Sequence, residues 1–355
     1  MKKITLLATA ILATCHTFAQ DTQPLKISGY IETYYTYDFN KPIINKRPDF
    51  IYSHNRHNEV NVNLAFIKAN YQTENVRANV AVGLGTYMTA NYAAEADVMK
   101  NAVEANAGIK LVKNANLWLD AGIFSSHIGF ESAISKDCWV LTRNISSENT
   151  PYFETGAKLS YATANQQLSA TLLYLNGWQR IKRLDGNSKP AGGLQITYKP
   201  SDKITLNYSN YLGYEGEDAV RTQRFYHNFY GIFQLSEGFG LTTGFDYGTQ
   251  QVAKGNNTKK EVLSPVVIAR YAFSPNWAVA GRYEHYRDKA AMIIASTNTN
   301  GFNVSGYSLN IDYSPIKQAL LRLEGKVYQG DEQFMHRDKI SDYNSSITTS
   351  LAISF

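Results

Sequence analysis

Cysteine is almost missing from this chain of 355 residues, which holds only Cys15 and Cys138. We expect Cys15 to be removed with the start of the chain, and a single remaining thiol can form neither an internal disulfide nor a cysteine metal cluster. Uninterrupted apolar runs long enough for a transmembrane helix are also missing, because no internal stretch approaches 18 apolar residues and the apolar run at the N-terminus is too short. The chain therefore needs another source of stability.

An excess of charge of one sign is missing as well. The sequence holds 35 Lys and Arg against 30 Asp and Glu, a formal net charge of +5. Removal of residues 1–19 takes away Lys2 and Lys3 and leaves 33 basic against 30 acidic residues, a charge of +3. This balance argues against nucleic acid as a partner.

The N-terminus has the pattern of a secretory signal peptide. Two lysines precede the apolar, uncharged residues 4–14, and Thr17–Ala19 supplies the small residues of a cleavage site. We expect residues 1–19 to be the signal peptide, because the apolar run is too short for a membrane anchor. Lipidation of Cys15 is the alternative, although Thr14 is a poor residue at the preceding position.

Aromatic residues are abundant, with 25 Tyr and 16 Phe, yet the mean hydropathy is only −0.33. A transmembrane barrel combines these properties, because one face of each strand meets lipid and the other meets water. The last residues, ITTSLAISF, show the pattern: Ile347 and every second residue to Phe355 are Ile, Thr, Leu, Ile and Phe, and small polar residues and an alanine lie between them. An edge strand of a soluble sandwich is the alternative.

Similar alternating runs occur in pairs joined by tight turns. For example, the run at 194–198 turns at Lys199–Asp202 into the run at 204–208. Seven such hairpins with a first and a last strand predict about 16 strands. Because no water satisfies a free sheet edge in hydrocarbon, the last strand must pair with the first. Phe355 also resembles the signal that the barrel-assembly machinery recognises in its substrates.

Longer polar stretches separate the hairpins. They lie at roughly 40–58, 86–101, 126–152, 178–191, 214–223, 249–262, 288–301 and 330–343. Within Tyr92–Asn106 we expect a loop followed by a strand, although its composition would also suit a helix. The predicted fold class is all-β: a closed antiparallel transmembrane β-barrel with short periplasmic turns and long extracellular loops. Residues 20–355 would form this single domain.

The sequence resembles the β-barrel porin-2, or OmpL-like, family, which is common in Bacteroidota. The residues that carry the resemblance are SGYIETYY at 28–35, GIF at 122–124, IGFE at 128–131, TRN at 142–144, PYFETG at 151–156 and NGW at 176–178. The resemblance covers most of the chain and implies a porin-like barrel in the bacterial outer membrane. In porins of similar strand count, the loop that corresponds to 126–152 folds into the barrel and narrows it.

Charged residues in this third long loop are therefore the predicted pore constriction: Glu131, Lys136, Asp137, Arg143 and Glu148. The loop could instead remain outside as a lid. Strand parity predicts a second set of charges that face the lumen: Glu32, Arg77, Asp120, Glu154, Lys158, Arg282, Glu284, Arg322, Glu324 and Lys326. Tyr30 and Tyr34 share the inward parity and could stack on a sugar.

The function predicted from these patterns is passive diffusion of small hydrophilic solutes across the outer membrane, without catalysis, cofactor or metal. Expected partners are outer-membrane lipid, the solutes, the assembly machinery and further copies of the chain. A plugged structural or surface-binding barrel is the alternative. His54 and His57 lack the pattern of a zinc site. A lipid-facing hydrolase would need a serine beside His285, and the sequence alone indicates none.

Overall fold

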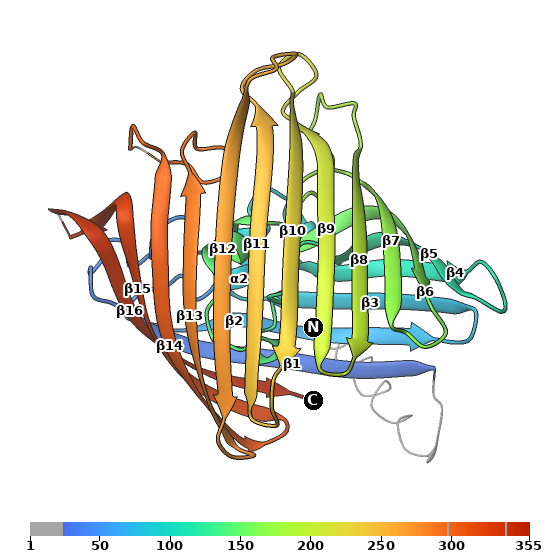
Figure 1. The fold of residues 1–355 in the computed structure, drawn as a ribbon, viewed down its shortest axis with the longest axis horizontal. Coiled ribbons are helices and arrows are strands. Elements are labelled where there is room, and N and C mark those ends of the chain that lie inside the picture. The colour runs from blue at the N-terminus through green and yellow to red at the C-terminus, as the bar shows by residue number, and fades with distance from the viewer. Residues whose placement is uncertain (1–23, 297, 338) are drawn as a thin grey trace, which may run out of the picture.

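The structure is a computed structural model that describes residues 24–355 apart from 297 and 338. The expected signal peptide at residues 1–19, with Cys15, lies outside the described residues. Over the described part of the chain, sixteen antiparallel strands form one closed barrel (Figure 1). This confirms the predicted fold class.

The strands follow one another around the barrel in chain order. Their bounds are β1 (Leu25–Asp38), β2 (Val60–Gln72), β3 (Val76–Leu84), β4 (Ala102–Lys110), β5 (Asn116–Ser125), β6 (Phe153–Ala162), β7 (Leu168–Leu175), β8 (Ala191–Ser201), β9 (Ile204–Glu215), β10 (Thr222–Gln234), β11 (Phe239–Gln251), β12 (Lys259–Ala272), β13 (Trp277–Asp288), β14 (Phe302–Ile316), β15 (Ala319–His336) and β16 (Lys339–Ser354).

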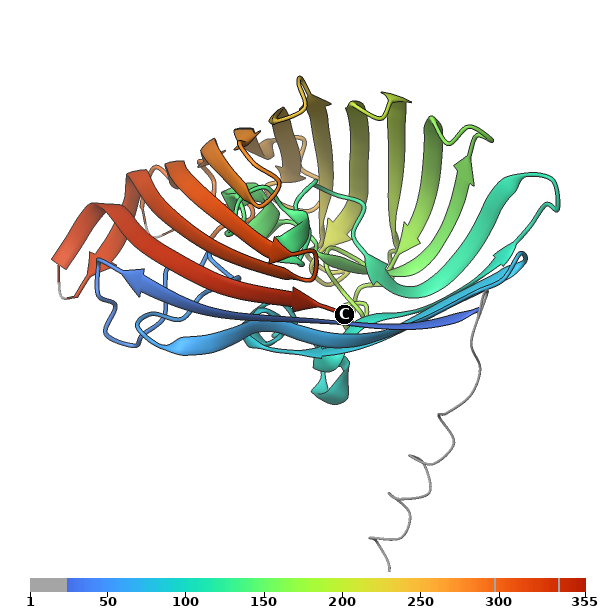
Figure 2. The same ribbon diagram turned by 90° about the horizontal axis from the view of Figure 1, so that it is seen from below.

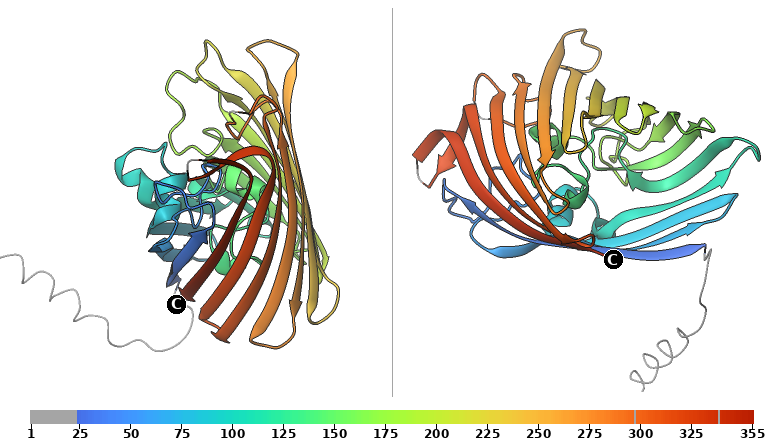
Figure 3. Two further views of the ribbon diagram at one scale, coloured as in Figure 1. Left: turned by 90° about the vertical axis from the view of Figure 1, so that its left-hand side faces the viewer. Right: turned by 60° about the horizontal axis from the view of Figure 1, so that its bottom comes forward.

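The seam between β1 and β16 closes the barrel. Tyr30 pairs with Ser354, and the ladder continues without a shift to Asp38 and Ser346. Beyond it, Gly29 and Phe355 exchange two backbone hydrogen bonds, of 2.7 and 3.0 Å. The ladder therefore includes the final residue, and Figures 2 and 3 show blue β1 beside red β16.

Side chains on each strand alternate between an outward apolar face and an inward face. On β13, Trp277 and Tyr283 are exposed on the outside, whereas Arg282 and Glu284 are buried inside. Outward aromatic residues also pack on one another, as Trp277 does on Tyr313 at 4.5 Å between ring centroids. This pattern suits a wall with lipid outside and polar groups within.

Connections alternate between short turns and longer loops, which defines two ends of the barrel. The short turns are 73–75, 111–115, 163–167, 202–203, 235–238, 273–276 and 317–318. At the opposite, long-loop end, most connections are longer, and those at 39–59, 85–101 and 126–152 are the longest.

The prediction of a long loop at 330–343 is wrong. β15 and β16 continue into this stretch, and after a shift in register Phe334 pairs with Ser341. Cross-strand pairing therefore satisfies backbone groups that we had assigned to a polar loop.

Short helices occupy the two longest loops after β3. They are α2 (Thr86–Asn91), η1 (Asp97–Asn101), η2 (Ser135–Asp137) and α3 (Ile145–Asn149). In Tyr92–Asn106, the expected strand begins at Ala102 and is preceded by the single turn of η1. None of the helices in the described chain has the length and apolarity needed to span a membrane.

Leu172 and Thr171 are neighbours on β7 that test the two faces of the wall. The outward Leu172 is 58% exposed, whereas Thr171 points inward. Leu172→Lys should lower the free energy of unfolding in lipid vesicles by about 2–4 kcal/mol, because an ammonium near the middle of the lipid layer loses its hydration. Urea titration with tryptophan fluorescence measures the change. The matched Thr171→Lys should cost much less, and equal costs for both variants would contradict the assignment of faces.

Candidate functional site

Loop 126–152 folds into the barrel. Figure 2 shows its helix α3 in green inside the ring of strands. Inward side chains of the wall bind its backbone: Thr142 N donates to Glu324 at 2.6 Å, and Arg282 Nη1 donates to Thr142 O at 2.7 Å. Glu284 accepts a hydrogen bond from Ile145 N at the start of α3. These bonds fix the middle of the loop against β13 and β15.

The loop also reaches the short-turn end. Arg322 donates to Ser135 O at 2.6 Å and to Cys138 O at 3.0 Å. Lys136 Nζ donates at 2.6 Å to Lys317 O, which lies in a short turn, and at 2.6 Å to Ser354 Oγ. Loop 126–152 therefore crosses the interior from one end of the barrel to the other.

The five predicted constriction residues lie in different surroundings. Glu131, Arg143 and Glu148 are buried, at 8%, 1% and 3% exposure, whereas Lys136 is half-buried and Asp137 is exposed. Arg143 donates to three carbonyl oxygens of its own loop, those of Ser132, Leu141 and Ala133, at 2.5–3.0 Å. Glu131 accepts from Asn144 N at 2.6 Å and from Asn144 Nδ2 at 2.8 Å. In this structure, Arg143 and Glu131 hold the loop in its fold.

Glu148 joins loop 126–152 to the first long loop, 39–59. One of its carboxylate oxygens accepts from Tyr52 N at 2.9 Å and from Ser53 N at 3.0 Å. Burial raises the pKa of Glu148 above its usual value, although the charge of Arg143 and these two N–H groups oppose the shift. Loop 39–59 is thus a second inward-folding segment, which no pattern in the sequence indicated.

Seven of the ten inward charges predicted from strand parity contact these two loops. They are Glu32, Glu154, Arg282, Glu284, Arg322, Glu324 and Lys326. The other three, Arg77, Asp120 and Lys158, lie on the inner face of β3, β5 and β6. There, Arg77 forms a bidentate ion pair with Asp120 at 2.5 and 2.6 Å.

A cavity of about 280 Å³ lies between loop 126–152 and the wall formed by β2 to β5. Lys68 and Glu104 line it from the wall and form an ion pair at 2.7 Å, with side chains 28% and 17% exposed. Phe130 and Tyr152 line it from the loop. We did not predict Lys68 or Glu104 as site residues, although their inward strand parity was a usable signal.

Glycines on the inner face of β11 make room for the loop. A Cβ on Gly240 would lie 2.6 Å from the ring of Trp139, and one on Gly244 would lie 2.7 Å from Phe130. Side chains larger than hydrogen would therefore push these aromatic rings aside. Glycines spaced four residues apart on one strand face were the sequence signal that could have located the part of the wall that the loop packs against.

Tyr30 and Tyr34 are buried, so their rings are not free to stack on a sugar. Tyr30 Oη lies 3.1 Å from Ser135 Oγ, and Tyr34 Oη lies 3.1 Å from Thr86 Oγ1. Cys138 is also buried, which raises the pKa of its thiol and disfavours a nucleophilic thiolate.

His285 does have a serine beside it, because Ser305 lies opposite on β14 with Oγ 3.0 Å from Nδ1. No carboxylate of the described residues forms an ion pair with His285. The contact satisfies two polar side chains on the outer face, as a low-polarity environment requires. His54 Nε2 lies 3.2 Å from Glu32, and no group of three metal-binding side chains occurs in the described chain.

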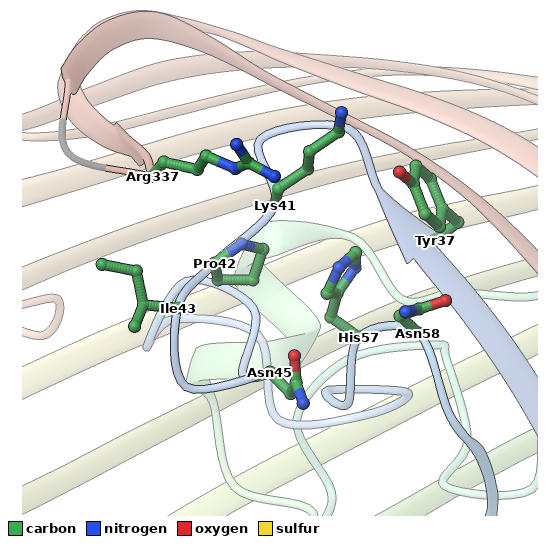
Figure 4. Close-up of a pocket in the computed structure, with 8 residues that line it drawn as sticks. All are labelled: Tyr37, Lys41, Pro42, Ile43, Asn45, His57, Asn58 and Arg337. Atoms are coloured by element: carbon green, nitrogen blue, oxygen red, sulfur yellow. The ribbon is translucent and has the colours of Figure 1, made fainter.

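Figure 4 shows a further cavity, of about 430 Å³, at the long-loop end. Lys41 comes from loop 39–59, and Arg337 follows β15. His57 also lines the cavity, but burial lowers its pKa, so its imidazole is neutral at pH 7. Lys41 and Arg337 therefore supply the positive charge of this cavity.

Comparison with known families decides the broader identity of the barrel. Residues 24–355 match the family described as "Putative beta-barrel porin-2, OmpL-like". The chain belongs to this family. It is accordingly an outer-membrane porin. The match includes every strand of the barrel and both inward-folding loops.

Solved porin structures share the fold at low sequence identity. OmpT of Vibrio cholerae is 10% identical, with a TM-score of 0.61 over 95% of this chain and 99% of that one. The channel DcaP of Acinetobacter baumannii is 13% identical, with a TM-score of 0.62 over 93% and 97%. An anion-selective porin from Comamonas acidovorans is 8% identical, with a TM-score of 0.60 over 93% and 99%. No curated protein matches this chain in sequence.

Arg143→Met should loosen loop 126–152 while leaving the barrel folded. The variant removes the donor of three carbonyl groups, of which that of Leu141 is buried, and a buried carbonyl left unpaired costs about 1–3 kcal/mol. We expect faster hydrogen exchange of the loop amides, on the order of tenfold or more, with unchanged exchange in β7 to β10. Asp137→Asn is the matched control, because Asp137 is exposed in the same loop. Equal exchange in Arg143→Met and the control would contradict the role of Arg143.

Proposed function

We propose that this porin is a passive diffusion channel for small hydrophilic solutes. The observation that supports the proposal most strongly is the unequal filling of the barrel. Loop 126–152 is fastened to the wall from β9 to β15 and to β1, and a cavity separates part of it from the wall at β2–β5. Half-exposed polar and charged side chains continue along the inner face of β3, β4 and β6 toward the short turns. A water-filled path along this wall suits a diffusion pore.

We place the constriction where loop 126–152 approaches Lys68 and Glu104 across the cavity. This position differs from an eyelet made by Glu131, Asp137 and Arg143. Glu131 lines the same cavity, but its carboxylate is bound by Asn144 and the guanidinium of Arg143 by carbonyl groups of the loop, so we propose that neither charge acts on a passing solute directly. Lys68 on β2 and Glu104 on β4 are partly exposed, form their ion pair across the intervening strand β3 and present both signs of charge at the gap.

Several further properties are proposed on the basis of the sequence and the family. Residues 1–19 would direct export and be cleaved after Ala19, residues 20–355 would form one barrel domain, and Phe355 would help the assembly machinery to recognise the chain. The long loops would face the cell exterior, and the source would be a member of the Bacteroidota. We propose no catalytic activity. One solved form of OmpT from Vibrio cholerae is described as a trimer, and we propose that copies of this chain also associate.

Purified, folded protein inserted into planar lipid bilayers should produce stepwise currents that increase linearly with voltage. The reason is that a fixed aqueous path conducts in proportion to the applied field. Folding is checked by the altered gel mobility of unheated barrels. Folded protein that inserts without producing steps would overturn the channel and favour the plugged structural barrel instead.

Phe130→Ala should widen the constriction, because Phe130 lines the cavity and its ring packs near Gly244 and Tyr230 on the opposite wall, so removal of the ring lets the loop move away from Lys68 and Glu104. Liposome swelling should then show faster entry of trisaccharides relative to monosaccharides. Phe273→Ala is the control, since Phe273 is an exposed aromatic in a short turn outside this cavity. An unchanged size dependence in Phe130→Ala would place the narrowest point elsewhere.

A further inference from the structure

Positive side chains gather on the inner wall near the short turns of β3 to β6. Arg77 follows the turn at 73–75, Lys110 precedes the turn at 111–115, and Lys158 lies opposite Asp120 on the adjacent strand. We call Arg77, Lys110 and Lys158 the basic wall. All three side chains are half-buried, so water reaches them.

Asp120 is the carboxylate that contacts this group, and it is already engaged. Both of its oxygens bind Arg77, and its side chain is only 2% exposed, against 27% for that of Arg77. Within the described chain, neither Lys110 nor Lys158 has an acidic group within ion-pair distance. Three cations and one anion therefore leave the basic wall with two uncompensated positive charges.

Aromatic rings support these cations without adding negative charge. Arg77 lies 4.4 Å above the ring of Trp118, and Lys158 Nζ lies 4.5 Å above that of Phe124. Lys110 pairs across the strands with Trp118. A cation held over a ring keeps its charge available to an ion in the adjacent water.

The remaining water-accessible charges of the lumen do not reverse this sign. Lys68 and Glu104 neutralise each other at the constriction. On the opposite wall, Arg270 and Lys136 share a cavity of about 350 Å³ with Asp137 and Asp312, of which Asp312 binds Arg322 at 2.8 Å. At the long-loop end, Lys41 and Arg337 add positive charge at the rim.

Buried carboxylates are covered by partners: Glu154, on β6 with Lys158, is fully buried and binds His127, and others lie on the far side of the interior. Glu284 and Glu324 are buried beneath loop 126–152 and accept hydrogen bonds from its backbone. Charges in direct contact with the aqueous path act on an ion more strongly than charges beyond the loop, because the interaction weakens with distance and with dissolved salt.

We infer that the pore prefers small anions, such as chloride and short carboxylates, over cations, and that the basic wall sets this preference. The inference rests on the proposed channel function. An anion leaving the constriction would pass Lys158, Arg77 and Lys110 in turn before it reaches the short turns. A cation on the same path meets no accessible carboxylate of this group, because Asp120 is covered by Arg77.

The test is the zero-current potential of the reconstituted full-length mature protein between concentrated and dilute KCl. We expect the zero-current potential of the wild type to have the sign that shows chloride to be more permeant than potassium. In the double variant Lys110→Glu/Lys158→Glu, the chloride-to-potassium permeability ratio should fall by a factor on the order of two or more. Lys182→Glu is the matched control, because Lys182 is an exposed lysine in the loop at 176–190 and should leave the ratio unchanged.

Each result bears on a different proposal. If the wild-type protein conducts but its zero-current potential shows potassium to be more permeant than chloride, the inferred anion preference is overturned and the proposed channel function stands. An equal ratio in the double variant and the wild type would overturn the role of the basic wall. Absence of conductance would overturn the proposed function itself. If the double variant fails to fold, Lys110→Gln and Lys158→Gln tested singly should each lower the ratio, and the wild-type sign alone still decides the preference.

Discussion

The constraint on which this structure depends is that hydrocarbon offers no hydrogen-bond partner to a free strand edge. Sixteen strands satisfy the constraint by closing on themselves, and the final backbone group of Phe355 is part of the ladder. Closure then creates an interior wide enough to hold water, and two loops fill part of it. The position of the aqueous path thus follows from which strands the loops bind.

Charged side chains of the wall have two roles, and burial separates them. Beneath loop 126–152, Arg282, Arg322 and Glu324 are bound to backbone groups and contribute to its position. On β3 to β6, Arg77 and Lys158 rest on aromatic rings beside water. A buried charge needs hydrogen-bonding partners to offset its lost hydration, whereas a charge beside the channel retains much of its hydration and can act on solutes.

Alternation along the chain was sufficient to predict the barrel, the strand number and the inward parity of residues such as Arg282 and Lys158, because these features follow from a period of two and from the solvent on each face. The role of a given loop charge was not accessible in this way. Arg143 binds carbonyl groups of its own loop, and Glu148 binds the backbone at Tyr52 and Ser53. Such contacts depend on how two irregular segments meet, which no local pattern encodes. Extension of β15 and β16 was missed because polar residues pair as well as apolar ones beyond the lipid.

The contact between Lys136 and Ser354 has a consequence for the order of assembly. Ser354 belongs to the last strand and pairs with Tyr30 of the first, so the same residue takes part in the closing seam and in a contact with loop 126–152. Glu32, next along the first strand's inward face, also accepts from Ser135 of that loop. Threading a loop of this length through a finished cylinder would leave these groups unpaired until the end. Wrapping the strands around a loop already docked on β9 to β15 avoids that intermediate, and the seam between β1 and β16 would then close last, around the loop.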